Sequence, residues 1–258
     1  DRTEVAGART LYHDLFTNGI VYLDIGFDLR TLPSDLLPYL PLFGRCLMEI
    51  GTETEDFVRL SQRIGARTGG LWTGSLVTNQ RLEPAPVAHF FVRGKAMLGQ
   101  VGDLLDIARD VLLTTRFDNP QRFLQMALEE KAGEESGLIP GGHSVVNLRL
   151  KSQFDEAAWA NEQMEGISYL FFLRELTKQI ESDWSAVLAK LEAVRDHVVN
   201  RSTLLVNATF PETDRAAVEP HIAALVQSMP ERPVVSGDWS PDLRPADEGL
   251  TLPAQVNY

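Results

Sequence analysis

The sequence holds one cysteine, Cys46, and no apolar run approaching the roughly 20 residues that a membrane-spanning helix requires. A single cysteine excludes an internal disulfide and a zinc site built from several cysteines. Because Cys46 lies within the apolar stretch 43–50, we interpret it as a buried structural thiol in a protein of a reducing compartment. We also expect no membrane partner.

Basic residues are scarce as well. The 258 residues include 24 Lys and Arg against 36 Asp and Glu, which gives a formal net charge of −12. Nucleic-acid binding relies on clustered Lys and Arg, so we expect no nucleic-acid partner. The negative charge favours cationic peptides as ligands, but it is also typical of proteins whose surface charge serves only solubility.

The motifs of metal and nucleophile chemistry are missing. Zinc peptidases place two imidazoles one helical turn apart in His-Glu-x-x-His or the inverted His-x-x-Glu-His, and neither motif occurs here. Gly-x-Ser-x-Gly and the phosphate-binding loop pattern are absent too. The sequence therefore assigns no catalytic, metal-binding or cofactor-binding residue to this chain. The histidines are far apart, at His13, His89, His143, His197 and His221.

Hydrophobic periodicity predicts an α+β fold. Residues 20–29 alternate between an apolar face and a polar face that carries Asp24 and Asp28, as in a half-buried strand. Runs at 71–78 and 87–92 predict a hairpin, and 203–210 predicts another strand. Neighbouring strands without a crossover favour a mostly antiparallel or mixed sheet covered by helices on one side. The helices are predicted over 33–50, 54–64, from 99 onward, from Asn119-Pro120 toward Ser136, from Ser144 after an interruption at Gly141-Gly142, from a cap at Ser182, and over 213–227.

The ends of the chain suggest a piece of a longer polypeptide. We expect one domain over 1–229, because the periodic segments end there. Residues 230–252 are rich in Pro and Gly without periodicity, which predicts a linker. Residues 253–258 resemble the opening of a strand without a continuation, and we interpret them as the start of the following domain.

Three local features allow two interpretations each. Gly69-Gly70 suits a close-approach loop for a ligand, but a helix end followed by a strand start explains it better. His143 suits a general base beside Ser144, although a structural place at a helix start is favoured. The aromatic group of Trp159, Tyr169, Phe171 and Phe172 suits either a peptide grip or core packing, with core packing slightly favoured.

Several strings in chain order resemble the third domain of the presequence protease and falcilysin-like zinc metallopeptidases, within the pitrilysin and insulin-degrading clan. The resemblance covers nearly the whole chain. The strings are Thr17-Asn18-Gly19-Ile20-Val21-Tyr22, Leu36-Leu37-Pro38-Tyr39-Leu40-Pro41-Leu42-Phe43, Glu49-Ile50-Gly51-Thr52, Thr68-Gly69-Gly70, Val92-Arg93-Gly94-Lys95, Gly142-His143 with Arg149, 162–170, Asp183-Trp184 and 253–258.

The resemblance implies a pitrilysin or mitochondrial processing peptidase-like domain without catalytic residues. It implies that zinc is held in the first domain of the parent enzyme, with no cofactor in this chain. The expected role is chamber wall and scaffold, with the other domains of the same polypeptide and unfolded peptide substrate, such as cleaved targeting peptides, as partners. Soluble protein of a bacterial cytoplasm or organelle matrix is the implied setting. A stand-alone interaction module of the same fold is the alternative. In either case Asp24 and Asp28 are expected to face the peptide chamber or plain solvent, with solvent favoured.

Overall fold

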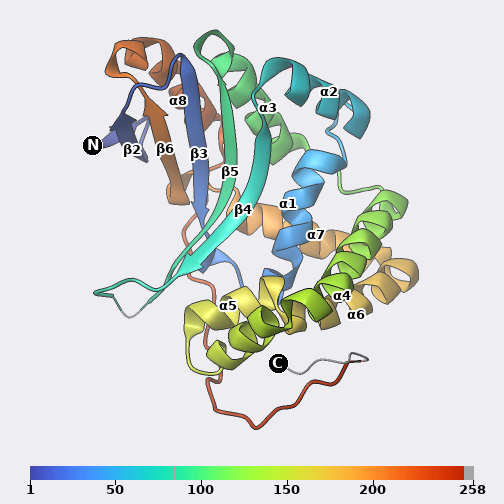
Figure 1. The fold of residues 1–258 in the computed structure, drawn as a ribbon. Helices are drawn as coiled ribbons and strands as arrows, with labels where there is room; N and C mark the ends of the chain where they lie inside the picture. Colours follow the sequence, from blue (N-terminus) through green and yellow to red (C-terminus); the bar gives the residue numbers. More distant parts are fainter. Residues whose placement is uncertain (84, 253–258) are drawn as a thin grey trace.

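The computed structural model describes residues 1–83 and 85–252. At its centre lies a mixed sheet with the strand order β1-β2-β6-β3-β5-β4 (Figure 1). The predicted α+β class, with a mixed sheet covered by helices, is confirmed. The strands are β1 (Arg2–Val5), β2 (Ala8–Asp14), β3 (Ile20–Asp28), β4 (Leu71–Thr78), β5 (Val87–Met97) and β6 (Leu204–Phe210).

The central strand β3 shows why the sheet forms. Its alternate residues Val21, Leu23, Ile25 and Phe27 are buried on one face, as the periodicity predicted. β3 pairs antiparallel with β5 on one side and with β6 on the other. β4 pairs antiparallel with β5, so the predicted hairpin is present, and β5 continues five residues beyond the predicted end at Val92.

The first two strands were not predicted. They form a hairpin whose two-residue turn, Ala6-Gly7, has positive φ at both positions. Such turns favour Asn-Gly or Asp-Gly. Because Ala6 stands at the first turn position, the sequence does not show this hairpin pattern. The buried Thr10 also interrupts the apolar alternation of β2. β2 pairs in parallel with β6, with Tyr12 opposite Ala208, and this pairing makes the sheet mixed.

Amphipathic helices cover one face of the sheet. Among these helices, α3 packs on β5, α8 packs on α3 and β1, and α1 packs on β4. The face opposite to these helices is the open face of the sheet. The covering helices are α1 (Leu40–Glu49), which follows a 3₁₀ turn over Ser34–Tyr39, α2 (Phe57–Arg67), α3 (Val101–Thr114), α7 (Trp184–Val198) and α8 (Arg215–Ser228).

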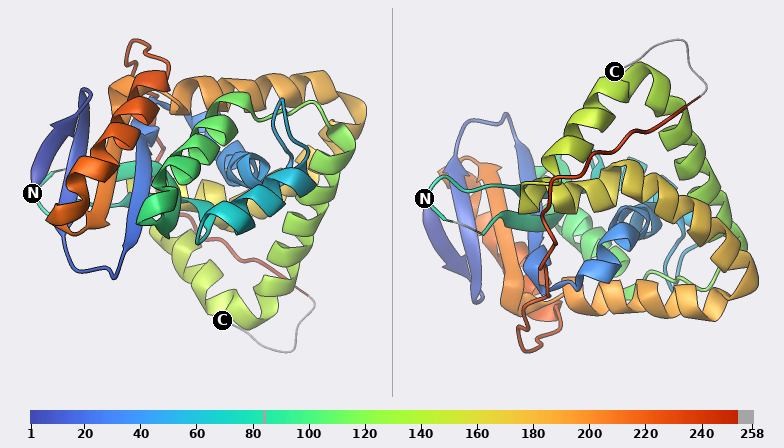
Figure 2. Two further views of the ribbon diagram at one scale, coloured as in Figure 1. Left: turned by 90° about the horizontal axis from the view of Figure 1, so that it is seen from above. Right: turned by 90° about the horizontal axis from the view of Figure 1, so that it is seen from below.

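A separate helical layer lies beside the free edge of β4, away from the other strands (Figures 1 and 2). It consists of α4 (Pro120–Lys151), α5 (Glu156–Glu165) and α6 (Ile167–Ser182). Asn119 caps α4 as predicted, with its Oδ1 accepting a hydrogen bond from Arg122 N at 3.0 Å. The cap predicted at Ser182 is wrong by one residue, because Asp183 Oδ1 accepts from Ala186 N.

The predicted interruption at Gly141-Gly142 is wrong, since α4 runs unbroken through both residues and through Pro140. Packing at both ends overrides the local preference: Phe123 and Met126 are buried near its start, and Arg149 is held near its end. α4 is long, yet no helix in the described part of the chain has the length and apolar character needed to cross a membrane.

The junction between α5 and α6 depends on a buried carboxylate. Glu162 is 1% exposed, and its Oε1 accepts hydrogen bonds from Ser168 N (3.1 Å) and Arg149 Nη1 (3.3 Å). Arg149 also donates to Ser168 Oγ and to Glu248, so one guanidinium joins α4, the helix junction and the C-terminal segment. Gly166 packs directly against the Glu162 carboxylate.

The segment 230–252 has no regular structure, but its first half is attached to the domain. Trp239 is buried, donates from Nε1 to Leu32 O at 2.8 Å, and lies under the Arg30 guanidinium at 4.7 Å. Gly237 N donates to Arg30 O at 2.6 Å. The linker assignment for 230–252 stays a prediction, and the strand start predicted over 253–258 lies outside the described residues.

We expect Gly166→Ala to destabilise the protein, because the new Cβ would overlap Glu162 Oε2 and displace the carboxylate from Ser168 and Arg149. Leaving such a buried group without partners costs about 1–3 kcal/mol. Gly133→Ala is the matched control: it lies in exposed α4 with open space around the added Cβ and should gain about 0.5–1 kcal/mol from helix propensity. Urea unfolding curves measure both. Equal effects of the two variants would contradict the role of Gly166.

Brief digestion with a protease of broad specificity should cut first within 240–249, whose backbone is largely unpaired, and only later within 230–239. Trp239→Ala should move the earliest cuts into 230–239, because it removes the indole that fixes this part to Leu32 and Arg30. Mass spectrometry of the early fragments locates the cuts. First cleavage inside α4 to α7 would show that the domain boundary is misplaced.

Candidate functional site

The histidines are distributed over separate elements and form no shared site. His13 lies on β2 and bonds through Nε2 to Asn207 Oδ1 at 2.9 Å, while His89 on β5 stacks on Phe91. Burial lowers the pKa of His89, which keeps its imidazole neutral. Within residues 1–83 and 85–252, no group of three or more His, Cys, Asp or Glu side chains is placed to hold a metal ion.

His143 was predicted to lie at a helix start, and this prediction is wrong. It is exposed in the interior of α4, because the helix does not break at Gly141-Gly142. Gly69 and Gly70 do connect a helix end to a strand start: Gly69 N donates to Lys95 O at 2.7 Å, and Gly70 has a φ of +125°. Their geometry is explained by this connection, because a positive φ favours glycine.

The aromatic group is divided between core and surface. Tyr169 and Phe172 stack in the core with their ring centroids 6.2 Å apart, and Trp159 packs against Trp239 at 6.3 Å. Phe171 alone is exposed, on the outer side of α6 beneath Arg174. Core packing therefore accounts for three of the four residues. Cys46 is fully buried, and burial raises the pKa of its thiol, as expected for a structural cysteine.

The open face of the sheet is a candidate binding surface. Strand register places Trp72, Arg93, Asp24 and Asn207 in one row across β4, β5, β3 and β6. Asp24 accepts from Asn207 Nδ2 at 2.9 Å and lies 3.9 Å from Arg93 Nε. The exposed apolar side chains on this face include Tyr22, Trp72 and Leu76.

A second row on this face is closely packed. Phe91 lies over Gly26, where an added Cβ would come within 2.6 Å of the ring, and Arg93 lies 4.7 Å above the same ring. Asp28 is occupied differently, since its Oδ1 accepts from Arg30 N and caps the turn after β3. The face thus carries both signs of charge with exposed aromatic side chains, which suits an extended peptide better than a single ion.

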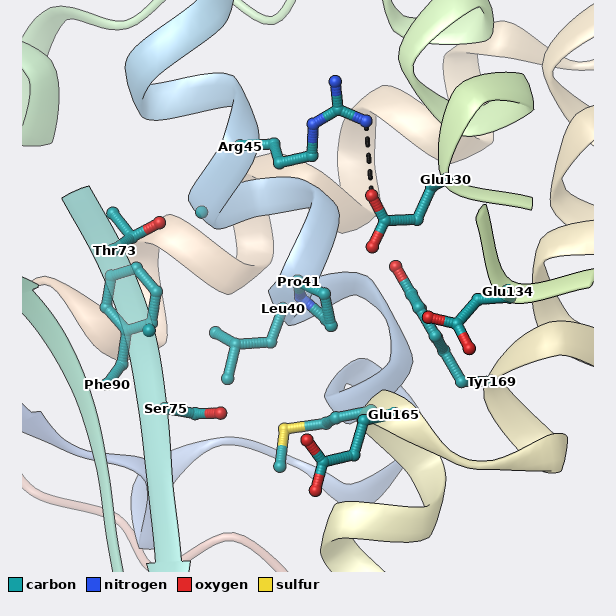
Figure 3. Close-up of a pocket in the computed structure, with 13 residues that line it drawn as sticks. Leu40, Pro41, Arg45, Thr73, Ser75, Phe90, Glu130, Glu134, Glu165 and Tyr169 are labelled. Carbon is teal, nitrogen blue, oxygen red and sulfur yellow. Dashed lines mark hydrogen bonds and ion pairs between the residues drawn. The ribbon is translucent and has the colours of Figure 1, made fainter. Parts of the chain in front are cut away.

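A pocket of about 290 Å³ lies between the edge strand β4, helix α1 and the α4–α6 layer (Figure 3). Its inner wall is apolar, formed by Leu40, Pro41, Phe90 and Met164. Its other side carries three carboxylates. They are Glu130 and Glu134 of α4 and Glu165 at the end of α5.

Acidic side chains outnumber basic ones in the lining of this pocket. Arg45 bonds to Glu130 at 3.2 Å, but it is shared with Glu49 at 2.8 Å and Glu129 at 3.0 Å. Glu134 and Glu165 make no salt bridge within the described residues. Partial burial, with the neighbouring carboxylates Glu130 and Glu165, raises the pKa of Glu134, and partial burial also raises the pKa of Glu165.

Tyr169 completes the pocket from α6. Its side chain is 1% exposed, and its hydroxyl points toward Glu130 and Glu134 (Figure 3). The hydroxyl is buried without an aligned hydrogen bond to any described residue. Burial, followed by the negative charge of Glu130 and Glu134, raises the pKa of this phenol, so it stays protonated. No local pattern in the sequence signals this site, because its carboxylates meet only after α4 and α5 pack together.

The architecture is similar to that of a solved inactive domain of an M16 peptidase. Such a domain from Pseudomonas fluorescens superimposes with a TM-score of 0.60 at 14% identity, covering 92% of this chain and 52% of that chain. This likeness concerns the fold alone. The chain itself belongs to the family of domains associated with M16 peptidases of subgroup C, whose model matches residues 1–176. The family resemblance seen in the sequence is confirmed.

Curated relatives extend over nearly the whole chain. It is 36% identical over 258 residues to "Presequence protease 1, chloroplastic/mitochondrial" of Arabidopsis thaliana, covering 99% of this chain and 24% of the relative. It is 25% identical to "Protein HypA" of Clostridium perfringens, covering 100% of this chain and 26% of the relative. The chain therefore spans about a quarter of the length of these relatives and is a presequence-protease-like domain.

The 258-residue chain should retain no stoichiometric zinc after washing with a chelator and should cleave no peptide. A hydrolytic zinc needs about three protein ligands and a water molecule, and the histidines of this chain lie on five different elements. Metal analysis and a fluorogenic peptide assay measure the two properties. One tightly held zinc together with turnover would sink this expectation.

Proposed function

We propose that this chain is the non-catalytic wall and scaffold domain of a zinc metalloendopeptidase that degrades unfolded peptides, such as cleaved targeting peptides. The zinc belongs to the first domain of the parent polypeptide, and the remaining domains are the partners of this one. Soluble protein of a bacterial cytoplasm or organelle matrix is the proposed setting. The family membership and the likeness to presequence proteases support this proposal.

The observation that carries the proposal is the open face of the sheet. Trp72, Tyr22 and Leu76 are each between 41% and 45% exposed on a face that no described helix covers. A row of such side chains between charged groups binds extended chains of varied sequence, because aromatic contacts need no particular partner. A domain that encloses unfolded peptides has to tolerate such variety.

Asp24 and Asp28 both have hydrogen-bond partners within the domain. Both lie on the polar face of β3, but Asp24 is bound to Asn207 and Asp28 caps a turn. Charge reversal at either position would disturb the domain itself, so neither residue provides a clean test of a peptide-binding role. The exposed apolar residues of β4 provide a cleaner test, since Trp72 and Leu76 are 45% and 43% exposed and neither caps a turn.

In the full-length protein, Trp72→Ala combined with Leu76→Ala should raise the KM for long unfolded peptides about tenfold with kcat little changed. Losing two partly buried apolar contacts costs about 1–2 kcal/mol of binding that substrate and transition state share. Leu128→Ala, a similarly exposed residue on α4, is the control. Steady-state kinetics on long and very short peptides measure the effect. The same change with both substrates, or none with either, contradicts the wall role.

A stand-alone interaction module is the second candidate. The observation that favours it is an exposed apolar group at one end of the sheet, where Phe16 is 87% exposed and Met97 is 54% exposed. The full-length reading frame distinguishes the two candidates. An inverted zinc motif upstream of this chain supports the peptidase, while its absence supports the module.

A further inference from the structure

We propose that the pocket between β4, α1 and the α4–α6 layer binds the side chain of a lysine residue, with its ammonium group held by Glu134, Glu165 and Tyr169 and its methylene stem against Leu40, Phe90 and Met164 (Figure 3). The choice of a substrate peptide as the source of this lysine rests on the proposed function. The binding of a lysine side chain rests on the pocket alone.

The first argument is the charge of the pocket. Three carboxylates face a cavity whose only cation among the lining residues, Arg45, is already shared with carboxylates outside it. Glu134 is half-buried and next to two other carboxylates, so its ionised form is disfavoured while the cavity is empty. A cation in the cavity removes this penalty, because opposite charges within a few ångströms stabilise the ionised form.

The second argument is the hydroxyl of Tyr169. This buried hydroxyl makes no well-aligned hydrogen bond to a described residue, and it points into the acidic side of the cavity. An ammonium group donates three hydrogen bonds, and acceptors approach the cavity from α4, α5 and α6 in turn. A planar guanidinium prefers two coplanar acceptors on one carboxylate, so this arrangement suits lysine better than arginine.

The third argument is the two-sided lining. A bare metal ion would leave the apolar wall of Leu40, Pro41, Phe90 and Met164 unused, and the described carboxylates are not grouped closely enough to hold a metal. Lysine combines an apolar stem with a charged end, as this cavity does. A volume of about 290 Å³ lies just below the roughly 300–1,000 Å³ range of small-ligand sites, which fits one long side chain.

Binding is measured with the 258-residue chain by titration calorimetry, using a capped pentapeptide Ala-Val-Lys-Val-Ala and the same peptide with norleucine in place of lysine. The two probes differ only in the ammonium group. The lysine peptide should bind at least about tenfold more tightly, which corresponds to about 1.4 kcal/mol. An arginine version should bind less tightly than the lysine version. Equal binding of lysine and norleucine peptides, or no binding by either at millimolar concentration, overturns the proposal.

Three variants locate the interaction. Glu134→Gln and Tyr169→Phe should each remove most of the difference between the lysine and norleucine peptides. Glu135→Gln is the matched control, because it removes the same charge from the next residue of α4, whose carboxylate is paired with Arg174 outside the pocket. Loss of the difference in the Glu135 variant as well would assign it to general charge and overturn the site.

The stability of the free chain gives an independent readout. Tyr169→Phe deletes a buried hydroxyl that makes no well-aligned hydrogen bond to a described residue, so the urea midpoint should stay the same or rise while lysine selectivity falls. A marked drop in the midpoint would show that the hydroxyl is bonded within the protein, which overturns its assignment as a ligand.

The full-length protein distinguishes the source of the lysine. If substrate supplies it, Glu134→Gln raises the KM for lysine-containing peptides but not for their norleucine versions. If another domain of the polypeptide supplies it, the full-length protein does not discriminate between the peptides, although the 258-residue chain does, and the substrate assignment is overturned. Neither result depends on Trp72 or Leu76, so failure here is separable from failure of the wall role.

Discussion

The buried carboxylate of Glu162 is the constraint on which the helical layer depends. At 1% exposure this carboxylate depends on donors within the protein: Ser168 N and Arg149 donate to its Oε1, while its Oε2 has no hydrogen-bond partner among the described residues. This fixes where α5 ends and α6 begins. Because Glu165 and Tyr169 lie on either side of that junction, the same contact sets their positions at the pocket. The Glu162 carboxylate can lie here because Gly166 has no side chain; an added Cβ would overlap its Oε2.

Sequence periodicity located the elements whose burial is simple. β3 and the stripe of α3 follow alternating and helical patterns because one face of each is core and the other is not. The periodicity failed where tertiary contacts override local preference. α4 passes through Pro140 and two glycines because it is held at both ends, and the hairpin of β1 and β2 turns at Ala6, a residue that rarely adopts a positive φ.

The candidate sites differ in how far the sequence could reveal them. The polar side of β3 was readable as an exposed sheet face, since alternate residues of a strand share a side. The pocket was not, because Glu130, Glu165 and Tyr169 come from three helices whose packing no local pattern records. The raised pKa values of Glu134 and Glu165 arise from their partial burial in the folded domain, which the sequence does not show.

The place of β6 in the sheet also governs when the domain can be assembled during synthesis. β6 lies between β2 and β3, yet among the strands of the described residues it leaves the ribosome last, about 190 residues after β2. Until then the β1–β2 hairpin and the β3–β5–β4 ribbon are two separate pieces, each with an unpaired edge exposed to other chains. A fragment cut at residue 176, where the family model ends, would lack the joining strand and stay open at both edges.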